Sequence, residues 1–454
     1  EKRPGAVLAV LLTWWAALPI AGRSGAFFAG LMMAAAILPG VEARLAKTDA
    51  VLLACLIAAQ GGLLRAFLVA EGYRLRRLTT TLFWTGIGLG ILVKGPIVPM
   101  VTGLTTLTLM LFSRSVGWFA RLRPLTGLLW VLVIVLPWLV AIGIVTKGAF
   151  FTEALGKDLL AKVGTGQESH GAPPGTYLAA FWGTFWPIAP FFALAVPFVW
   201  RHRRERGVLF TLAWIVPSWL VFEAVATKLP HYVLPLYPAF AILTAAALFR
   251  DELQVDAIWK KLVGLLVPLV PVVLAVGVPV GLFWLDGTLT PAATALTLVA
   301  AVLSVFAWRY LARNDAASAL VTTFAAAAIL YAGVYQFAIP EARSIWLSPR
   351  LADVVLRSAP CRDPQLATAG YREPSLVFLT RTDLAMVKDD EAASFLAEDG
   401  CRVAFVEGRG EEAFRARATE LGFNPHLLGR VAGRNLNGGK ELDIGVFMRE
   451  GAVR

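Results

Sequence analysis

Long apolar runs, separated by short charged stretches, fill most of this 454-residue chain. A helix needs roughly 20 apolar residues to cross the hydrocarbon core of a bilayer, and about 17–25 are usual. By that rule we place about twelve membrane-spanning helices before residue 340. The predicted spans are 5–21, 25–40, 50–70, 79–93, 96–113, 125–145, 177–199, 208–225, 232–249, 262–285, 289–307 and 317–338. Residues 1–339 are therefore predicted to form an all-α polytopic membrane domain.

The composition supports this class of protein. Hydrophobic residues make up 57% of the chain and charged residues 16%, whereas soluble domains average about 45–50% and about 25%. The net charge of +11 does not require a nucleic-acid partner, because Lys and Arg gather in the cytoplasmic loops of membrane proteins and bind anionic headgroups there. The lipid bilayer is the expected partner, and we predict no nucleic acid.

Basic residues recur at every second junction between the predicted spans. They are Arg74, Arg76 and Arg77; Arg114, Arg121 and Arg123; Arg201, Arg203, Arg204 and Arg206; Arg250, Lys260 and Lys261; and Arg309 and Arg313. The positive-inside rule assigns these junctions to the cytoplasm. The periplasmic segments would then be 41–49, 94–95, 146–176, 226–231, 286–288 and everything after 339. A multi-pass protein of the bacterial inner membrane is expected.

The polar segment 340–454 is predicted to be a small periplasmic α/β domain. Its β-type runs are Gln365–Ala369, Leu376–Thr380, Arg402–Val406, Leu427–Val431 and Leu442–Met448, and its helical patterns are 391–399 and 411–421. It contains no phosphate loop, no metal-spaced Cys/His set and no catalytic triad signature, so we interpret it as an accessory domain. Cys361 and Cys401 are its two cysteines, and an oxidising compartment would permit a disulfide between them.

The segment Ala43–Asp49 places Arg44, Lys47 and Asp49 between two apolar runs. Such charges are costly at a membrane unless they lie in water or bind something. On spacing alone a solvated turn is the simpler interpretation. The alternative is the mouth of a periplasmic active site.

Lys94 lies in Leu92-Val93-Lys94-Gly95-Pro96, directly before a helix-breaking Gly-Pro. One interpretation is a lysine that snorkels to the interface, whose replacement would hardly change stability. The other is a phosphate-binding cation, in which case Lys94→Ala would lower donor affinity by about one to two decades. Both stay open on sequence alone.

Two further periplasmic segments carry polar residues. The loop 146–176 contains Glu168 and His170. Two possible ligands at a two-residue spacing are weak evidence for a metal site, and a conformational or substrate-contacting loop is the favoured interpretation. A divalent metal is allowed but not indicated, and no cofactor is predicted.

The periplasmic segment 226–231 contains Lys228-Leu229-Pro230-His231 and is followed by Tyr232. Tyr232 is either an interfacial belt residue or part of a clamp with Lys228 for a phosphate headgroup.

The motifs Ala43–Asp49, Leu92–Pro96, Glu168-Ser169-His170 and Lys228–Pro235 occur here in order, each at a predicted periplasmic edge. Together they resemble the polyprenyl-phosphate-dependent GT-C glycosyltransferases, in particular the lipid A aminoarabinose transferases and the protein O-mannosyltransferase-like family. The resemblance implies a GT-C fold and transfer of a hexosyl or pentosyl unit from a lipid carrier such as undecaprenyl phosphate. The acceptor would be lipid A, a glycan or a protein.

The resemblance also implies roles for individual residues. Asp49 would be the active-site carboxylate, and Lys94 and Tyr232 would contact the donor phosphate. The remaining candidates would bind substrate or line the cavity: Arg44, Lys47, Glu168, His170, Lys228 and His231. A carboxylate would deprotonate or orient the acceptor hydroxyl, while cations stabilise the departing lipid phosphate.

One departure from the family pattern is large. Members begin with a further span and a first periplasmic loop that carries an acidic motif, usually Asp-Glu, and no such motif precedes residue 5. We expect either that the chain is a fragment or that the catalytic carboxylate comes from elsewhere. Two rival functions remain, a lipid-linked sugar transporter or flippase and a non-catalytic scaffold. Transporters, however, usually show internal repeats and charges near the bilayer midplane, and neither is evident here.

Overall fold

A computed structural model describes residues 3–45, 47–70, 73, 75–152, 172–253, 257–435 and 438–450. The chain divides into two compact units. The first comprises Glu1–Ala275 and Leu296–Tyr331, and the second comprises Val276–Ala295 and Ala332–Arg454. The division of the sequence into domains 1–339 and 340–454 stays our proposal.

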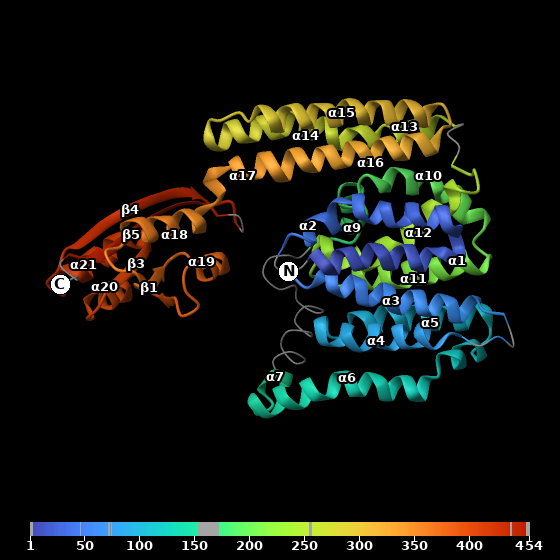
Figure 1. The fold of residues 1–454 in the computed structure, drawn as a ribbon, viewed down its shortest axis with the longest axis horizontal. Helices are drawn as coiled ribbons and strands as arrows, with labels where there is room; N and C mark the ends of the chain where they lie inside the picture. Colours follow the sequence, from blue (N-terminus) through green and yellow to red (C-terminus); the bar gives the residue numbers. More distant parts are fainter. Residues whose placement is uncertain are drawn as a thin grey trace. The chain divides into compact units, whose positions relative to one another are not determined.

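The first unit is a bundle of apolar helices (Figure 1). Its elements are α1 (Arg3–Ala35), α2 (Ile37–Glu42), α3 (Asp49–Leu68), α4 (Arg77–Lys94), α5 (Ile97–Ser113), η1 (Gly117–Leu122), α6 (Pro124–Val145), α7 (Ala149–Phe151), α9 (Thr176–Thr184), α10 (Ile188–Arg201), α11 (Arg206–Ala224), η3 (Pro230–Leu236), α12 (Tyr237–Leu248) and α13 (Ile258–Gly264). Three further helices have residues in both units: α14 (Leu266–Asp286), α15 (Pro291–Ala312) and α16 (Ala316–Ala332).

The described helices confirm a polytopic membrane protein. Eight of them are long and apolar enough to cross a bilayer, or up to nine if the bent pair α9 and α10 is one span. A helical segment nevertheless overlaps each predicted span. The lower number has three causes besides the bent pair: α1 covers two predicted spans, α5 has only 17 residues, and α4, with 18 residues, is not among the helices that are apolar enough. Helix α1 breaks at Gly22, and Gly30 lies against Val10, so its two halves run antiparallel.

Small residues allow the helices to approach closely, as is usual in membranes. A Cβ at Gly86 of α4 would lie 2.5 Å from the Cys55 carbonyl oxygen of α3. Between α3 and α5, the buried Gln60 amide donates a hydrogen bond to the Thr105 hydroxyl at 2.9 Å. Helix α3 is therefore held on two sides, which fixes the position of its first residue, Asp49.

The second unit contains a five-stranded sheet of order β2-β1-β3-β5-β4. The strands are β1 (Gln365–Ala369), β2 (Ala385–Val387), β3 (Arg402–Glu407), β4 (Pro425–Arg434) and β5 (Glu441–Arg449). Strands β2, β1 and β3 run parallel, whereas β5 pairs antiparallel with both β3 and β4. The other elements of this unit are η4 (Gly333–Ala338), α17 (Ile339–Glu341), η5 (Arg343–Ile345), η6 (Gly408–Gly410), α18 (Leu347–Ser358), α19 (Pro374–Leu379), α20 (Asp389–Ala397) and α21 (Glu411–Glu420).

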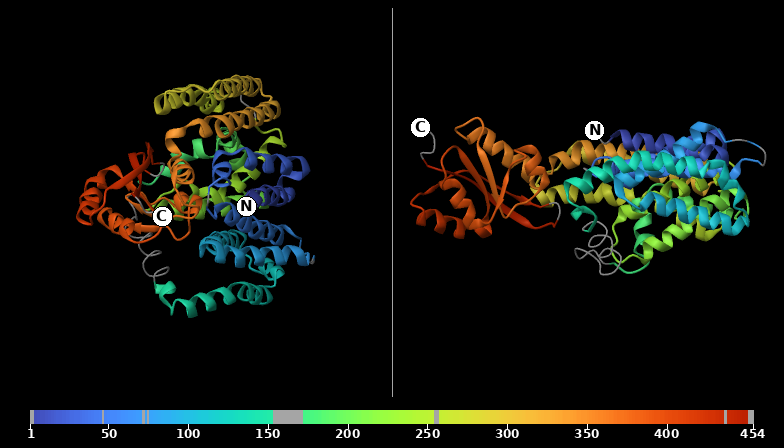
Figure 2. Two further views of the ribbon diagram at one scale, coloured as in Figure 1. Left: turned by 60° about the vertical axis from the view of Figure 1, so that its left-hand side comes forward. Right: turned by 90° about the horizontal axis from the view of Figure 1, so that it is seen from below.

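Helices cover both faces of this sheet (Figure 2). Alternation along β3 places Phe405 in the core under α18 and α19, and Val406 in the core under α20 and α21. Cys361 and Cys401 form the predicted disulfide. One strand prediction is wrong: the run 376–380 lies largely in helix α19, because Pro374 occupies its first turn, where proline favours helix initiation.

Candidate active site at the α2–α3 junction

Asp49 and Lys94 form an ion pair, with Nζ 2.6 Å from Oδ1. Asp49 is the first residue of α3 and Lys94 is the last residue of α4. The helix ends there because Gly95 adopts φ 61°, a conformation that residues with a Cβ rarely take. The Asp49 side chain is 5% exposed and that of Lys94 is 35% exposed. The structure therefore brings together the predicted carboxylate and the predicted phosphate-binding cation.

A second carboxylate, Glu42, lies in the same region and is almost fully buried, with 2% exposure. Its Oε1 atom is 3.8 Å from the Nδ1 atom of His231 and 3.9 Å from the Nζ atom of Lys47. Its Oε2 atom is buried and has no hydrogen-bond partner among the described residues. Burial raises the pKa of Glu42, and neighbouring Asp49 adds to that effect, whereas Lys47 and Lys94 oppose it. Glu42 is therefore a poorly solvated carboxylate with one oxygen available to a ligand.

Helix α2 carries Glu42 at its last position, and the sequence fixes this helix locally. Ala36 is extended (φ −68°, ψ 139°) and separates α2 from α1. The Ile37 amide then donates a hydrogen bond to the Trp186 carbonyl at 3.0 Å. Because Trp186 lies at the 116° bend between α9 and α10, the bend positions the start of α2.

Beside these groups is a cavity of about 210 Å³. Its polar lining comes from Glu42 and Arg44, and the rest of its wall is mainly aliphatic, from α1, α3 and the segment before α12. Arg44 is exposed and donates a hydrogen bond to the Gly40 carbonyl at 2.7 Å. The cavity thus has an apolar wall and a charged rim.

The structure places the other predicted site residues less uniformly. His231 and Tyr232 lie in η3, with ring centroids 5.0 Å apart, and His231 reaches Glu42. Lys228 is buried and donates a hydrogen bond to the Val225 carbonyl at 2.7 Å, so this cation supports its own turn. Glu168 and His170 lie outside the described residues. Within the described ranges, no three His, Cys, Asp or Glu side chains come together as a metal site.

Glu42 was missed as a site residue by the sequence argument. The available signal was its position, because it is the other carboxylate of the predicted periplasmic segment 41–49. A sequence gives no indication of which side of such a junction faces inward, and that side decides whether a carboxylate is solvated or buried.

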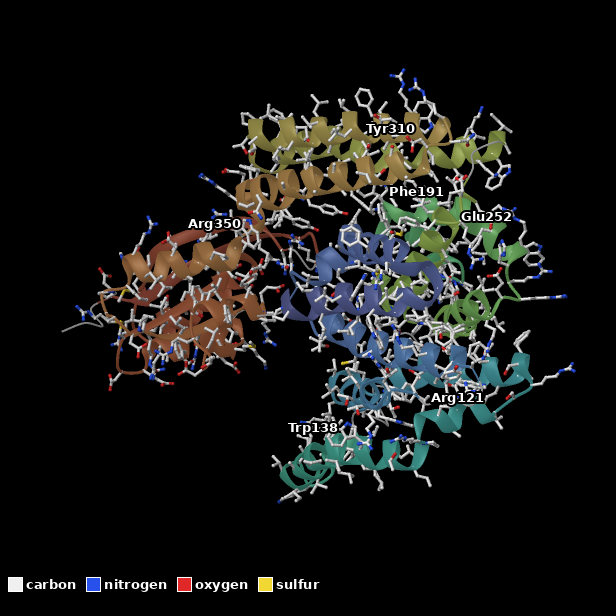
Figure 3. The ribbon with its side chains drawn as sticks, turned by 45° about the vertical axis from the view of Figure 1, so that its right-hand side comes forward. Arg121, Trp138, Phe191, Glu252, Tyr310 and Arg350 are labelled. Carbon is white, nitrogen blue, oxygen red and sulfur yellow. A yellow bond between two sulfur atoms is a disulfide. The ribbon has the colours of Figure 1, made fainter. Side chains whose placement is uncertain are left out.

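The opposite end of α3 is basic. Arg121 donates hydrogen bonds to the carbonyls of Ala66 and Val69 at 3.0 and 2.6 Å, and Arg206 donates to the Phe67 carbonyl. Figure 3 labels Arg121 at this end of the unit. A helix of 20 residues is about 30 Å long, close to the hydrocarbon thickness. Two of the predicted cytoplasmic junctions therefore meet at one end of α3, and the candidate site lies at the other.

The chain is similar in sequence to a group of curated membrane transferases. No family model matches the chain. It is 26% identical over 186 residues to an undecaprenyl phosphate-α-4-amino-4-deoxy-L-arabinose arabinosyl transferase from Pseudomonas aeruginosa, a match of 40% of this chain and 33% of that protein. The transferase of the same name from Erwinia tasmaniensis is 26% identical over 241 residues, which cover 52% and 43% of the two chains. The chain thus spans less than half the length of these curated relatives.

Solved structures extend the likeness to nearly the whole chain. The crystal structure of ArnT from Cupriavidus metallidurans bound to undecaprenyl phosphate superposes with a TM-score of 0.74 and 19% identity, over 98% of this chain and 83% of that one. The apo form of the same protein gives a TM-score of 0.72. The chain therefore has the fold of ArnT, in agreement with the GT-C fold that the sequence motifs predicted.

Proposed function

We propose that this protein is a membrane glycosyltransferase that moves a sugar from a polyprenyl phosphate carrier to an acceptor hydroxyl. The observation that carries the proposal is the buried, partly unpartnered carboxylate of Glu42 beside the Asp49–Lys94 ion pair and an apolar cavity. The names of the curated relatives and the carrier bound in ArnT support the same donor class.

The cations would act on the leaving group. A lipid phosphate diester that departs from the anomeric carbon needs charge neutralisation more than protonation. Lys94 is partly exposed and can reach a phosphate from the end of α4. Arg44 and Lys47 are exposed in the segment directly before Asp49, the ion-pair partner of Lys94. The aliphatic wall of the cavity would accommodate the first part of the polyprenyl chain. Tyr232 remains a proposed donor contact.

The carboxylates would act on the acceptor. A general base works best when its pKa lies near the working pH. Burial raises the pKa of Glu42 and so brings it closer to neutral pH. Asp49 is already occupied by Lys94, so we assign proton abstraction or orientation of the acceptor to Glu42 and a supporting electrostatic role to Asp49. His231, 3.8 Å from Glu42, would hold that carboxylate in position.

The acceptor class would be lipid A, a glycan or a protein, and the sugar a pentose or a hexose. By the alternation of basic junctions, the reaction would take place at the periplasmic face of the bacterial inner membrane, with the α/β domain on the same side. A divalent metal is not needed for this scheme.

The test uses the full chain reconstituted in nanodiscs with polyprenyl-phosphate sugars and candidate acceptors. The wild type should release free polyprenyl phosphate in an acceptor-dependent manner. Glu42→Gln should lower turnover by about 10²–10⁴-fold, the usual contribution of a general base, while undecaprenyl phosphate still raises the melting temperature. Asp315→Asn, at an exposed carboxylate between α15 and α16, is the matched control. A Glu42→Gln variant with unchanged turnover would refute the assignment.

A further inference from the structure

A second cavity, of about 880 Å³, lies entirely within the second unit. The end of α14, the segment η5, helix α18, the turn after β3 and the strands β4 and β5 line it. Its charged lining residues are Arg343, Arg350, Arg409, Arg434, Asp286, Glu407, Glu441 and Asp443. The arginines and the carboxylates of the lining are thus equal in number. Figure 3 labels one of the arginines, Arg350. The size falls within the range of about 300–1,000 Å³ that is usual for ligand sites.

Polar side-chain atoms without a hydrogen-bond partner concentrate in this cavity: two carboxylate oxygens and one hydroxyl. Within the described part of the second unit, the buried side-chain atoms without a hydrogen-bond partner are Asp286 Oδ2, Ser344 Oγ and Asp443 Oδ1. All three residues line this one cavity. Leaving a buried polar atom unpaired is costly, so three such atoms in one cavity point to a ligand that pairs with them.

The neighbouring contacts hold these acceptors in place. The Ser344 amide donates to Asp286 Oδ1 at 3.0 Å, which leaves Oδ2 for another donor. Arg430 donates to Asp443 Oδ2 at 2.8 Å and likewise leaves Oδ1. Each carboxylate is therefore anchored through one oxygen and offers the other.

Donors and an aromatic surface complete the lining. The Arg343 guanidinium has no hydrogen bond or ion pair to any described residue. Arg434 lies 4.3 Å from the ring centroid of Trp284 and covers one face of it, and Trp284 is 67% exposed. Trp284, the two unpaired carboxylate oxygens and the Arg343 guanidinium therefore all belong to the lining of one cavity.

The charge balance selects the ligand class. A phosphate could pair with the Arg343 guanidinium but would also meet the unpaired carboxylate oxygens of Asp286 and Asp443, and a polyamine would meet the arginines. A sugar supplies several hydroxyl donors, accepts from arginine, and has an apolar face that packs on tryptophan. We propose that this cavity binds a neutral or amino-sugar oligosaccharide.

We infer that the bound oligosaccharide is part of the acceptor, and only this assignment rests on the proposed function. The cavity would then bind a saccharide part of the acceptor other than the sugar that carries the reacting hydroxyl. Such remote binding contributes to catalysis by positioning the reacting hydroxyl.

The test measures binding of a panel of short neutral and amino-sugar oligosaccharides to the full chain by saturation-transfer NMR and calorimetry. A zwitterionic detergent replaces maltosides, whose headgroups would compete. Inorganic phosphate and spermidine are separate arms. The variants are Asp286→Asn and the exposed Arg343→Gln, and the matched controls are Asp353→Asn and Arg357→Gln, an exposed pair on α18 outside the cavity.

We expect at least one oligosaccharide to bind, with affinity reduced about tenfold or more in both cavity variants and unchanged in the controls, as for one lost charge-assisted hydrogen bond. The proposal is overturned if no oligosaccharide binds, if only phosphate or spermidine binds, or if a correctly melting Arg343→Gln variant binds sugar as well as the wild type. The oligosaccharide binding assay contains no sugar donor, so its failure does not test the proposed glycosyl transfer. Binding of undecaprenyl phosphate, measured separately, would show that the proposed donor site is intact in that case.

Discussion

The Asp49–Lys94 ion pair provides a quantitative test of the candidate site. Removing one partner leaves the other without its countercharge, so single substitutions overstate the value of the pair. We therefore consider the cycle of Lys94→Met, Asp49→Asn and the double variant. Methionine keeps most of the lysine stem, and asparagine keeps the shape of aspartate. Replacing a Lys94 that only snorkelled would change stability little, whereas replacing a Lys94 that is paired with Asp49 also removes the ion pair.

The expected size follows from burial. Breaking a fully buried pair costs about 3–5 kcal/mol, whereas an exposed pair contributes about 0.2–1 kcal/mol. Asp49 is 5% exposed but Lys94 is 35% exposed, so solvent screens part of the attraction. We expect a coupling energy of about 1.5–3 kcal/mol, as for a hydrogen bond between charged groups. The assay is equilibrium unfolding in mixed micelles, with the free energy of unfolding determined for all four proteins.

The exposed pair Asp353–Arg357 on α18 is the control, with side chains 50% and 78% exposed. Its coupling energy should stay below about 1 kcal/mol. A coupling energy of about 0.5 kcal/mol or less between Asp49 and Lys94 would be no larger than the usual error of additivity. That result would show that the two charges are independently solvated and would remove the electrostatic basis of the site.

Burial raises the pKa of Glu42 above 4.5, so the folded state binds more protons than the unfolded state in this pH range. The free energy of unfolding should therefore fall as pH rises from about 4.5 towards the pKa of Glu42 in the folded state. In thermal melts across this pH range, Glu42→Gln should flatten that slope. Replacing Cys361 and Cys401 by alanine should destabilise the α/β domain by about 2–4 kcal/mol in denaturant titrations; a change within error would refute this. A periplasm-specific reporter fused after Arg454 should be active, and activity of a cytoplasmic reporter there would reverse the proposed orientation.

The membrane helices could be predicted because their signal is local. A run of about 20 apolar residues suffices to indicate a span, and basic junctions indicate which ends belong together. Both arguments place Asp49 and Lys94 at one end of the bundle, and the structure shows them in contact there. The contact between Glu42 and His231 joins segments almost 190 residues apart, and no local pattern gives the rotation of α2 that turns Glu42 inward.

The α/β domain shows which local signals were misinterpreted. The run after Pro374 is apolar enough for a strand, but proline at a helix start is the stronger signal. Helix α18 was missed, although Leu347, Leu351 and Val355 recur at helical spacing and are all buried. Strand β2 has three residues and carries too little periodicity to be predicted.

The position of the Asp49–Lys94 pair explains how one charge could change partners in the proposed reaction. Asp49 begins α3, where the helix dipole favours a negative charge, and Lys94 ends α4, where it favours a positive one. Each charge therefore has a second source of stabilisation besides its partner. When a lipid phosphate attracts Lys94, Asp49 would keep the amide dipoles at the start of α3, worth about 0.3–1 kcal/mol at an exposed site and more when partly buried. Opening the pair would then cost less than separating two charges that depend on each other alone, and the cation would become available as negative charge develops on the leaving phosphate.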